Sequence, residues 1–354
     1  MMRDHGAGSG WRFKRSLRRG GGGAVLARAW PFLLSAGIAG GGAGGGWAFL
    51  QPGLFASLGT AGPTLWAAAA GAGACLGLIL GILLALVRAP ARLAATTADR
   101  LEAIAEAPVL ALAPFLSARD LRSVAPDLRY PGGLIVSAPE SVFAQAIRTA
   151  AGSIGRWRAG EAGLSVAMIA AAPREGTSSL ALALARAAAA AGKRVALVDA
   201  DPRERSLSVL LELDQGRGLW TALDEPLDDP GGAGLLEGHM AQDAFTSLII
   251  LPQGEGSSST RELYGHPRLP ALLAGLKARF DLVVLDCGPV GLVDGRLTAT
   301  QADAVVLVAA WNATLVRHLA VARRGLERLG AVVPGVIVNG LGEAAVRRWL
   351  QATS

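Results

Sequence analysis

Hydrophobic positions divide the sequence into an apolar first quarter and a longer part in which short apolar runs alternate with helical patterns. The first quarter contains two uncharged runs, at residues 30–50 and 65–87. Each run approaches or exceeds the ~20 residues with which a helix crosses the hydrocarbon core of a bilayer. The two runs therefore predict a transmembrane hairpin over residues 30–88, following a basic tail at residues 1–29.

Glycines four residues apart occur in both runs, at Gly40 and Gly44 and at Gly73, Gly77 and Gly81. Small residues at this spacing let helix backbones approach closely, so the two spans are expected to pack on each other or on a partner. The alternative is that small residues are simply abundant, since the chain contains 47 glycines.

Positive charges flank the two runs, whereas residues 51–64 between them carry no charge. The flanking basic residues are Arg12, Lys14, Arg15, Arg18 and Arg19 before the first run and Arg88, Arg92 and Arg100 after the second. Basic flanks stay on the cytoplasmic side, so both ends of the chain are expected there, at a bacterial inner membrane. A cleaved signal peptide at the first run and a nucleic-acid-binding N-terminal arm are alternative interpretations.

After a juxtamembrane stretch at 89–163, which contains one helical pattern at 141–154, apolar strands alternate with helices. The strands are expected at 164–170, 194–201, 247–252, 280–286, 303–310 and 333–340. Helices are expected at 178–192, 266–279 and 315–330. This alternation predicts an α/β domain over 164–354, with a mostly parallel sheet covered by helices on both faces.

Candidate chemistry lies where three of these strands end. A tight turn at Glu175 and Gly176 leads from the first strand into a helix, and backbone amides at such a turn bind phosphate. Ser178 and Asp286 are expected to hold magnesium, and Asp199 or Asp201 to orient or deprotonate a nucleophile. Parallel sheets bind ligands at these ends. For each acid, the alternative is a helix cap or turn residue.

Zinc and disulfide chemistry are excluded by composition. The chain has only two cysteines, Cys75 and Cys287, which lie far apart, and its four histidines do not cluster in sequence. The net charge of +6 and the mean hydropathy of +0.39 agree with a membrane-associated protein better than with a soluble enzyme.

From about Glu102 onward the sequence resembles the cytoplasmic part of the bacterial tyrosine kinases of the polysaccharide co-polymerase family. These are P-loop proteins related to the partition and division-site ATPases. The matching segments, in chain order, read "EAPVLALAP", "PESVFAQAIRTA", "AAAPREGTS", "DADPR", "GRGLWTAL", "LPQGEGSSSTREL", "VVLDCGPV" and "GVIVNG". The resemblance implies ATP or ADP with Mg²⁺ as ligand. It implies nucleotide contacts at Pro173, Arg174, Glu175, Gly176, Thr177, Ser178, Ser179 and Asn339.

Departures from the family concentrate at the chemistry. Thr177 stands where the family has the lysine that bridges the β- and γ-phosphates, and Arg174 stands where glycine is common. The tyrosine cluster that family kinases phosphorylate in their C-terminal tail is missing, because the only tyrosines are Tyr130 and Tyr264. Losing one preorganised donor costs on the order of 3–4 kcal/mol at a transition state.

Assembly features also depart from the family. The ring-contact motif Glu-x-x-Arg-x-x-Arg stands here as Gln145, Arg148 and Ala151, which keeps one charge of three. The short connection at residues 51–64 leaves no room for the large periplasmic domain of Gram-negative members. The expected partners are therefore polysaccharide polymerisation or export proteins, a separate co-polymerase with a periplasmic domain, or further copies of this chain, and no nucleic acid.

Together these features predict a membrane-anchored, kinase-like protein of exopolysaccharide or capsule synthesis that is impaired as a catalyst and acts as a regulator or scaffold. Two alternatives stay open. One is an active ATPase or protein tyrosine kinase that acts on another protein, with Arg174 in place of the lysine. The other is a positioning ATPase related to the partition proteins, against which the hairpin argues.

Overall fold

The computed structural model describes residues 71, 73–81, 102–103, 106–124, 130–157, 163–224, 238–256, 260–291, 293–314 and 316–353. The chain separates into two compact units, Met1–Pro90 and Ala91–Ser354. In the first unit, Gly71 and residues 73–81 are helical, and the remainder of the predicted hairpin lies outside the described residues. Among the residues described, no helix has both the length and the apolar character that a membrane span requires.

The second unit is built on one eight-stranded sheet in the order β1-β8-β7-β2-β6-β3-β5-β4. All pairings are parallel except the short antiparallel pair of β4 and β5. The strands are β1 (Val109–Pro114), β2 (Leu164–Ala170), β3 (Val195–Asp199), β4 (Ala241–Gln242), β5 (Ile249–Leu251), β6 (Leu282–Cys287), β7 (Ala304–Ala310) and β8 (Gly335–Leu341). The prediction of a mostly parallel α/β sheet is confirmed.

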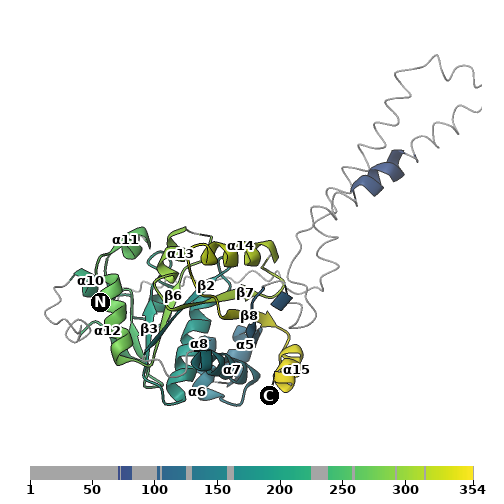
Figure 1. Ribbon diagram of the computed structural model, residues 1–354. Coiled ribbons are helices and arrows are strands. Elements are labelled where there is room, and N and C mark those ends of the chain that lie inside the picture. Colours follow the sequence, from purple (N-terminus) through teal and green to yellow (C-terminus); the bar gives the residue numbers. More distant parts are fainter. Residues whose placement is uncertain are drawn as a thin grey trace, which may run out of the picture. The chain divides into compact units, whose positions relative to one another are not determined.

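Helices cover both faces of this sheet (Figure 1). On one face α6 (Leu134–Ser137), α7 (Val142–Trp157), α8 (Thr177–Ala190) and α9 (Ser206–Leu210) bury Phe143, Ile147, Leu182 and Leu207. The opposite face carries α10 (Leu219–Asp224), α11 (Thr260–Gly265), α12 (Leu269–Arg279), α13 (Val293–Ala299) and α14 (Val316–Glu327). The central strands are buried from both sides, which explains why their sequences are continuously apolar instead of alternating.

Two elements of this sheet domain come from residues 89–163, the stretch that the sequence assigned to a juxtamembrane segment. β1 pairs in parallel with β8 at the sheet edge, and α7 packs against β1 and α8. The remaining helices are α5 (Ala118–Val124), the 3₁₀ turn η2 (Pro131–Gly133) and α15 (Glu343–Thr353), which packs near α7 and β1. The fold therefore begins before the phosphate-binding turn.

Candidate functional site

The three strand ends singled out from the sequence lie side by side, because β2, β6 and β3 are neighbours in the sheet. Asp286 of β6 is in register with Met168 of β2 on one side and with Asp199 of β3 on the other. The turn after β2 leads directly into α8. The fold thus brings Asp199, Asp286 and the start of α8 to one edge, as predicted for parallel strands.

Asp199 is fully buried and held by hydrogen bonds. Its Oδ2 accepts from the Ser208 amide at 2.8 Å and from the Ser208 hydroxyl at 2.6 Å, and its Oδ1 accepts from the Asp201 amide at 3.3 Å. Burial raises the pKa of Asp199 to about 6, and these hydrogen bonds offset only part of that rise. The Ser208 hydroxyl also accepts from the Gln253 amide at 2.8 Å, which links the ends of β3 and β5.

Asp286 is almost completely buried and accepts a hydrogen bond from Ser178. Its Oδ2 atom has no hydrogen-bond partner among the described residues. Burial, followed by the charge of neighbouring Asp199, raises the pKa of Asp286 well above its ordinary value. The two predicted magnesium ligands, Ser178 and Asp286, are therefore in direct contact, and one carboxylate oxygen still lacks a donor or a cation.

Asp201 lies at the same edge, six per cent exposed. Its Oδ1 accepts from the Arg203 amide at 3.1 Å, which forms a tight turn after β3. Its Oδ2 approaches Gly288 so closely that a Cβ built at that glycine would lie 2.8 Å away. Burial raises the pKa of Asp201. Asp201 is thus the more accessible of the two acids predicted to act on a nucleophile.

Glu175 and Asn339 brace the turn from behind. Glu175 is buried, with Oε2 accepting from the Ala172 amide at 2.9 Å and Oε1 accepting from the Thr314 hydroxyl. Burial raises its pKa, and the hydrogen bond from Thr314 acts against that rise. The Asn339 amide donates to the Glu175 carbonyl at 3.0 Å, and a Cβ at Gly176 would lie 2.6 Å from Asn339 Nδ2. Glycine at this position lets the turn approach β8.

The front of the turn carries the residues that depart from the family. Gly176 has φ of 88° and caps α8 without a side-chain hydrogen bond, so the first amides of this 14-residue helix receive no such cap. Thr177 is buried, and its Oγ1 has no hydrogen-bond partner in the part of the chain described. Arg174 is exposed, as is Pro173, and Arg174 has φ of 66°, a conformation that favours glycine. Ser179 is half-buried in the first turn of α8.

This edge fits a phosphate group with a bound magnesium ion. The helix start supplies backbone amides, Ser178 and Asp286 supply hard oxygen ligands, and two buried oxygens, on Thr177 and Asp286, lack partners among the described residues. Across the described ranges no cluster of three or more His, Cys, Asp or Glu side chains is arranged to hold a metal ion. Magnesium with few protein ligands and several phosphate or water oxygens is the arrangement that such a site favours.

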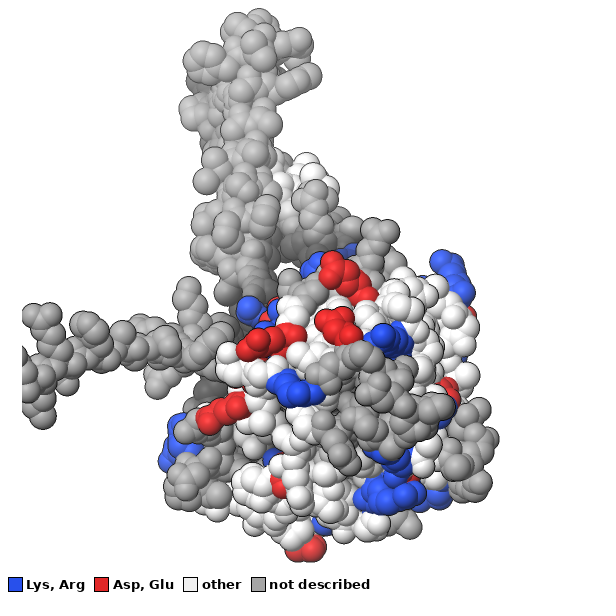
Figure 2. Space-filling model, turned by 90° about the vertical axis from the view of Figure 1, so that its left-hand side faces the viewer, with Lys and Arg blue, Asp and Glu red and all other residues white. Residues whose placement is uncertain are grey.

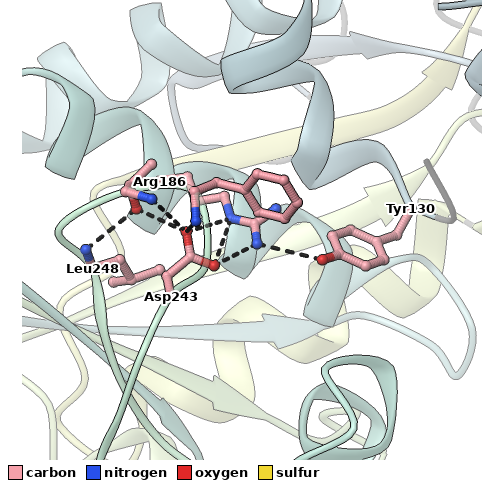
Figure 3. A network of polar contacts seen from close by, with 6 residues as sticks. Tyr130, Arg186, Asp243 and Leu248 are labelled. Carbon is pink, nitrogen blue, oxygen red and sulfur yellow. Dashed lines mark hydrogen bonds and ion pairs between the residues drawn. The ribbon is translucent and has the colours of Figure 1, made fainter. Parts of the chain in front are cut away.

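A second buried charge cluster anchors the far half of α8 (Figure 3). Arg186 is fully buried; its Nη2 pairs with Asp243 Oδ1 at 2.5 Å, and its Nε donates to Asp243 Oδ2 at 3.1 Å. The guanidinium also donates to the Tyr130 hydroxyl at 3.4 Å and lies 4.8 Å from the centre of the Phe245 ring. The Thr246 hydroxyl donates to Asp243 at 2.9 Å. This cluster ties α8 to the turn between β4 and β5.

Comparison with known proteins agrees with this geometry. ExoP, the succinoglycan biosynthesis transport protein of Rhizobium meliloti, is 31% identical over 210 residues, which are 58% of this chain and 26% of ExoP. The tyrosine-protein kinase CpsD of Streptococcus pneumoniae is 28% identical over 170 residues, which are 48% of this chain and 72% of CpsD. This chain is a relative of the bacterial tyrosine kinases.

Solved structures give the same relationship. The BceF tyrosine kinase domain superposes with a TM-score of 0.59 at 25% identity, and the match covers 71% of this chain and 99% of that domain. The kinase domain of the Escherichia coli tyrosine kinase ETK matches with a TM-score of 0.58 at 21% identity, covering 67% of this chain and 91% of that domain. No protein-family model matches the sequence. The chain covers only about a quarter of ExoP, so the activity of the whole transport protein does not transfer directly.

The sequence interpretation missed two residues that shape this edge, Ser208 and Thr314. Ser208 lies in the second position of the short helix α9, and nothing in its sequence surroundings marks it as a partner of Asp199. Thr314 follows the end of β7, so the rule that polar residues at strand ends converge would have found it if it had also been applied to that strand.

Proposed function

We propose that this chain is a membrane-anchored, kinase-like protein of exopolysaccharide or capsule synthesis and export, with its main domain on the cytoplasmic side. Its P-loop domain acts by binding other proteins of the pathway, with nucleotide as a structural ligand, and is impaired as a catalyst. The relationship to ExoP and to the tyrosine kinases supports the pathway and the domain type. The hydrophobic runs at 30–50 and 65–87 support the anchor.

Thr177 carries the proposal of impaired catalysis. In the P-loop proteins that this chain resembles, a lysine at this position bridges the terminal phosphates of the nucleotide. Thr177 is too short to reach them and brings no charge, and its hydroxyl is buried without a partner among the described residues. The loss of one charged donor corresponds to roughly a hundred- to thousandfold lower rate.

The remaining parts support retained nucleotide binding. Ser178 and Asp286 would hold magnesium, which supplies charge neutralisation to the phosphates when it is bound. The amides at the start of α8 would receive phosphate oxygens, while Glu175 and Asn339 keep the turn in place. Pro173 and Ser179 border the same turn, and Asp199 supports the end of β3 through Ser208.

The alternative of an active kinase or ATPase requires another cation at the phosphates. Arg174 is the candidate, because it lies in the turn and is exposed. Its side chain starts from a residue with φ of 66°, one position before buried Glu175. The same alternative needs a tyrosine in another protein, because this chain has only Tyr130 and Tyr264.

Phosphotransfer by the full chain in detergent tests this proposal. The wild-type chain, Thr177→Lys and Thr177→Val would be incubated with magnesium, radiolabelled ATP and a tyrosine-containing polymer. We expect wild type and Thr177→Val to transfer phosphate equally slowly and Thr177→Lys to exceed them roughly a hundredfold. Robust transfer by wild type, with no gain in Thr177→Lys, would establish the active kinase instead.

A further inference from the structure

Helix α14 exposes a stripe of basic and apolar side chains on the face turned away from the sheet (Figure 1). Leu319, Ala322 and Leu326 of α14 are buried in the core. On the exposed side, Arg317, Val321, Arg324 and Arg328 follow one another at intervals of four, three and four residues. Residues at this spacing share one side of a helix, and the Arg328 amide still donates to the Arg324 carbonyl at 3.1 Å. We call these four residues the α14 stripe.

The α14 stripe carries an excess of positive charge. Residues 316–328 include four arginines and one glutamate. That glutamate, Glu327, pairs with Arg323 at 2.8 Å, and Glu106 lies 3.7 Å from the same arginine. Both acids thus face Arg323, on the flank of the helix, and within the described residues the ion pairs of α14 involve Arg323 alone. The face seen in Figure 2, which lies over α10 and α12, instead mixes positive and negative side chains.

Aliphatic side chains continue the stripe at its end. Val321 is 58% exposed, Leu329 is 42% exposed and Val332 is 50% exposed. Gly330, with φ of 81°, ends the helical turn and leaves Leu329 and Val332 at the tip. Arginines interleaved with exposed aliphatic residues suit the headgroup region of an anionic bilayer, where the cations meet lipid phosphates and the aliphatic groups enter the acyl boundary. Surfaces for single-stranded nucleic acid use aromatic stacking instead.

The stripe lies near the point where the chain enters the sheet domain. The Val336 amide donates to the Pro108 carbonyl at 2.9 Å, so the start of β8, which follows α14, adjoins the start of β1. The ion pair of Arg323 with Glu106 lies at the same place. Between the predicted end of the second span at residue 87 and Glu106 the sequence has 18 residues. A chain of that length reaches at most about 60 Å, so the domain is tethered close to the surface that anchors it.

We propose that the α14 stripe docks on the anionic cytoplasmic surface of the membrane that anchors the chain. The inference rests on the membrane anchoring in the proposed function and adds a second, electrostatic contact for the P-loop domain. Arg317, Arg324 and Arg328 bind lipid phosphates, and Val321, Leu329 and Val332 enter the headgroup layer. Docking of this kind weakens as salt rises, because the contacts between the arginines and the lipids are exposed.

Fluorescence of the full chain in lipid vesicles tests the inference. In a Cys75→Ser background, Val321→Cys is labelled with an environment-sensitive dye, since Cys287 is buried and does not compete. Val209→Cys on α9, which is 57% exposed in the native residue, is the matched control. Vesicles contain either phosphatidylcholine alone or phosphatidylcholine with phosphatidylglycerol. We expect a blue shift at position 321 only in the anionic vesicles, its loss in Arg317→Glu/Arg324→Glu/Arg328→Glu, and its retention in Arg347→Glu/Arg348→Glu.

Other outcomes would overturn the inference. Equal shifts at 321 in both vesicle types, or equal shifts at 209 and 321, would show that anionic lipid does not select the α14 stripe. A shift in neutral vesicles upon addition of duplex DNA would assign the stripe to nucleic acid, and a shift that depends on chain density would assign it to a second copy. Failure of the chain to float with vesicles would contradict the anchor as well, whereas a floating chain with a silent probe at 321 contradicts docking alone.

Discussion

Helix α8 connects two buried charge clusters that are neutralised in different ways. At its far half, Arg186 and Asp243 neutralise each other, with Tyr130, Phe245 and Thr246 around them. At its start, Asp286 accepts from Ser178, has one oxygen without a partner among the described residues, and lies beside Asp199 in the sheet. The first cluster holds the fold together without a ligand. The second gathers negative charge that a magnesium ion would neutralise.

This contrast separates structural charge from functional charge. A buried ion pair whose members satisfy each other stabilises one arrangement of the chain, and breaking it is costly. Acidic groups held close together in a buried edge raise each other's pKa, and such perturbed groups cluster at functional sites. The two clusters should therefore respond with opposite sign when one of their carboxylates is removed.

The largest expected effect is in the Arg186 cluster. Asp243→Ala leaves the Arg186 guanidinium buried without its carboxylate, so the free energy of unfolding should fall by about 3–5 kcal/mol. Urea unfolding of the domain, followed by circular dichroism, measures this loss. The matched control is Asp281→Ala, which breaks the exposed pair with Arg194 and should lower stability by about 1 kcal/mol or less. Equal losses in the two variants would contradict the contrast.

Removing a carboxylate from the other cluster should stabilise the ligand-free domain. Asp286→Asn eliminates a buried charge next to Asp199, so the free energy of unfolding at pH 7 should rise by about 1 kcal/mol or more. The same variant should lose magnesium-dependent nucleotide binding. Asp303→Asn is the control of opposite sign, since Asp303 accepts from Lys277 at 2.8 Å and from Ser165. If Asp286→Asn destabilised the domain as Asp303→Asn does, the carboxylate of Asp286 would be structural.

The pH dependence of stability should reveal Asp199. Its pKa is about 6 in the fold, against an ordinary value of 3.8, so the folded state holds an extra proton between these values. Stability contributed by this group therefore falls as pH rises from about 4 to 6 and is restored on acidification. The difference in unfolding free energy between wild type and Asp199→Asn should change by on the order of 1–3 kcal/mol across that window. A constant difference from pH 4 to 7 would be inconsistent with the raised pKa.

Arg174 offers the smallest effect and tests the active-kinase alternative. Arg174→Ala removes the cation and should leave the dissociation constant of Mg-ATP within about twofold, if Arg174 does not replace the lysine. Arg174→Gly should in addition relieve the positive φ, raising stability by up to about 1 kcal/mol. Calorimetry and thermal unfolding check the two parts. A tenfold loss of affinity in Arg174→Ala would show that this arginine takes over the role of the lysine.

Periodicity predicted the centre of the fold well, and the edges poorly. The expected strand at 164–170 is β2, and strands were correctly placed at β3, β5, β6, β7 and β8, because both faces of these strands are buried and their sequences are continuously apolar. β1 and β4 were missed. β4 has only two residues, and β1, "VLALAP", contains proline and becomes a strand through its pairing with β8.

The candidate site shows the same limit. Strand ends brought Asp199, Asp286 and the Thr177 turn together as expected, because that convergence follows from parallel topology alone. The bracing of Glu175 by Thr314, and of Asp199 by Ser208, depends on contacts between residues 139 and 9 positions apart, for which the sequence carries no local pattern. The pairing of Arg186 with Asp243 is hidden for the same reason.

Binding of Mg-ATP and Mg-ADP by the full chain, measured by calorimetry for wild type and Thr177→Lys, tests the central claim most directly. The account predicts weak magnesium-dependent binding by wild type, abolished in Asp286→Asn, and at least about tenfold tighter binding of Mg-ATP in Thr177→Lys, because the substitution adds the missing cation to an otherwise complete cradle. Tight binding and steady hydrolysis by wild type, unchanged in Thr177→Lys, would contradict it and establish a working ATPase.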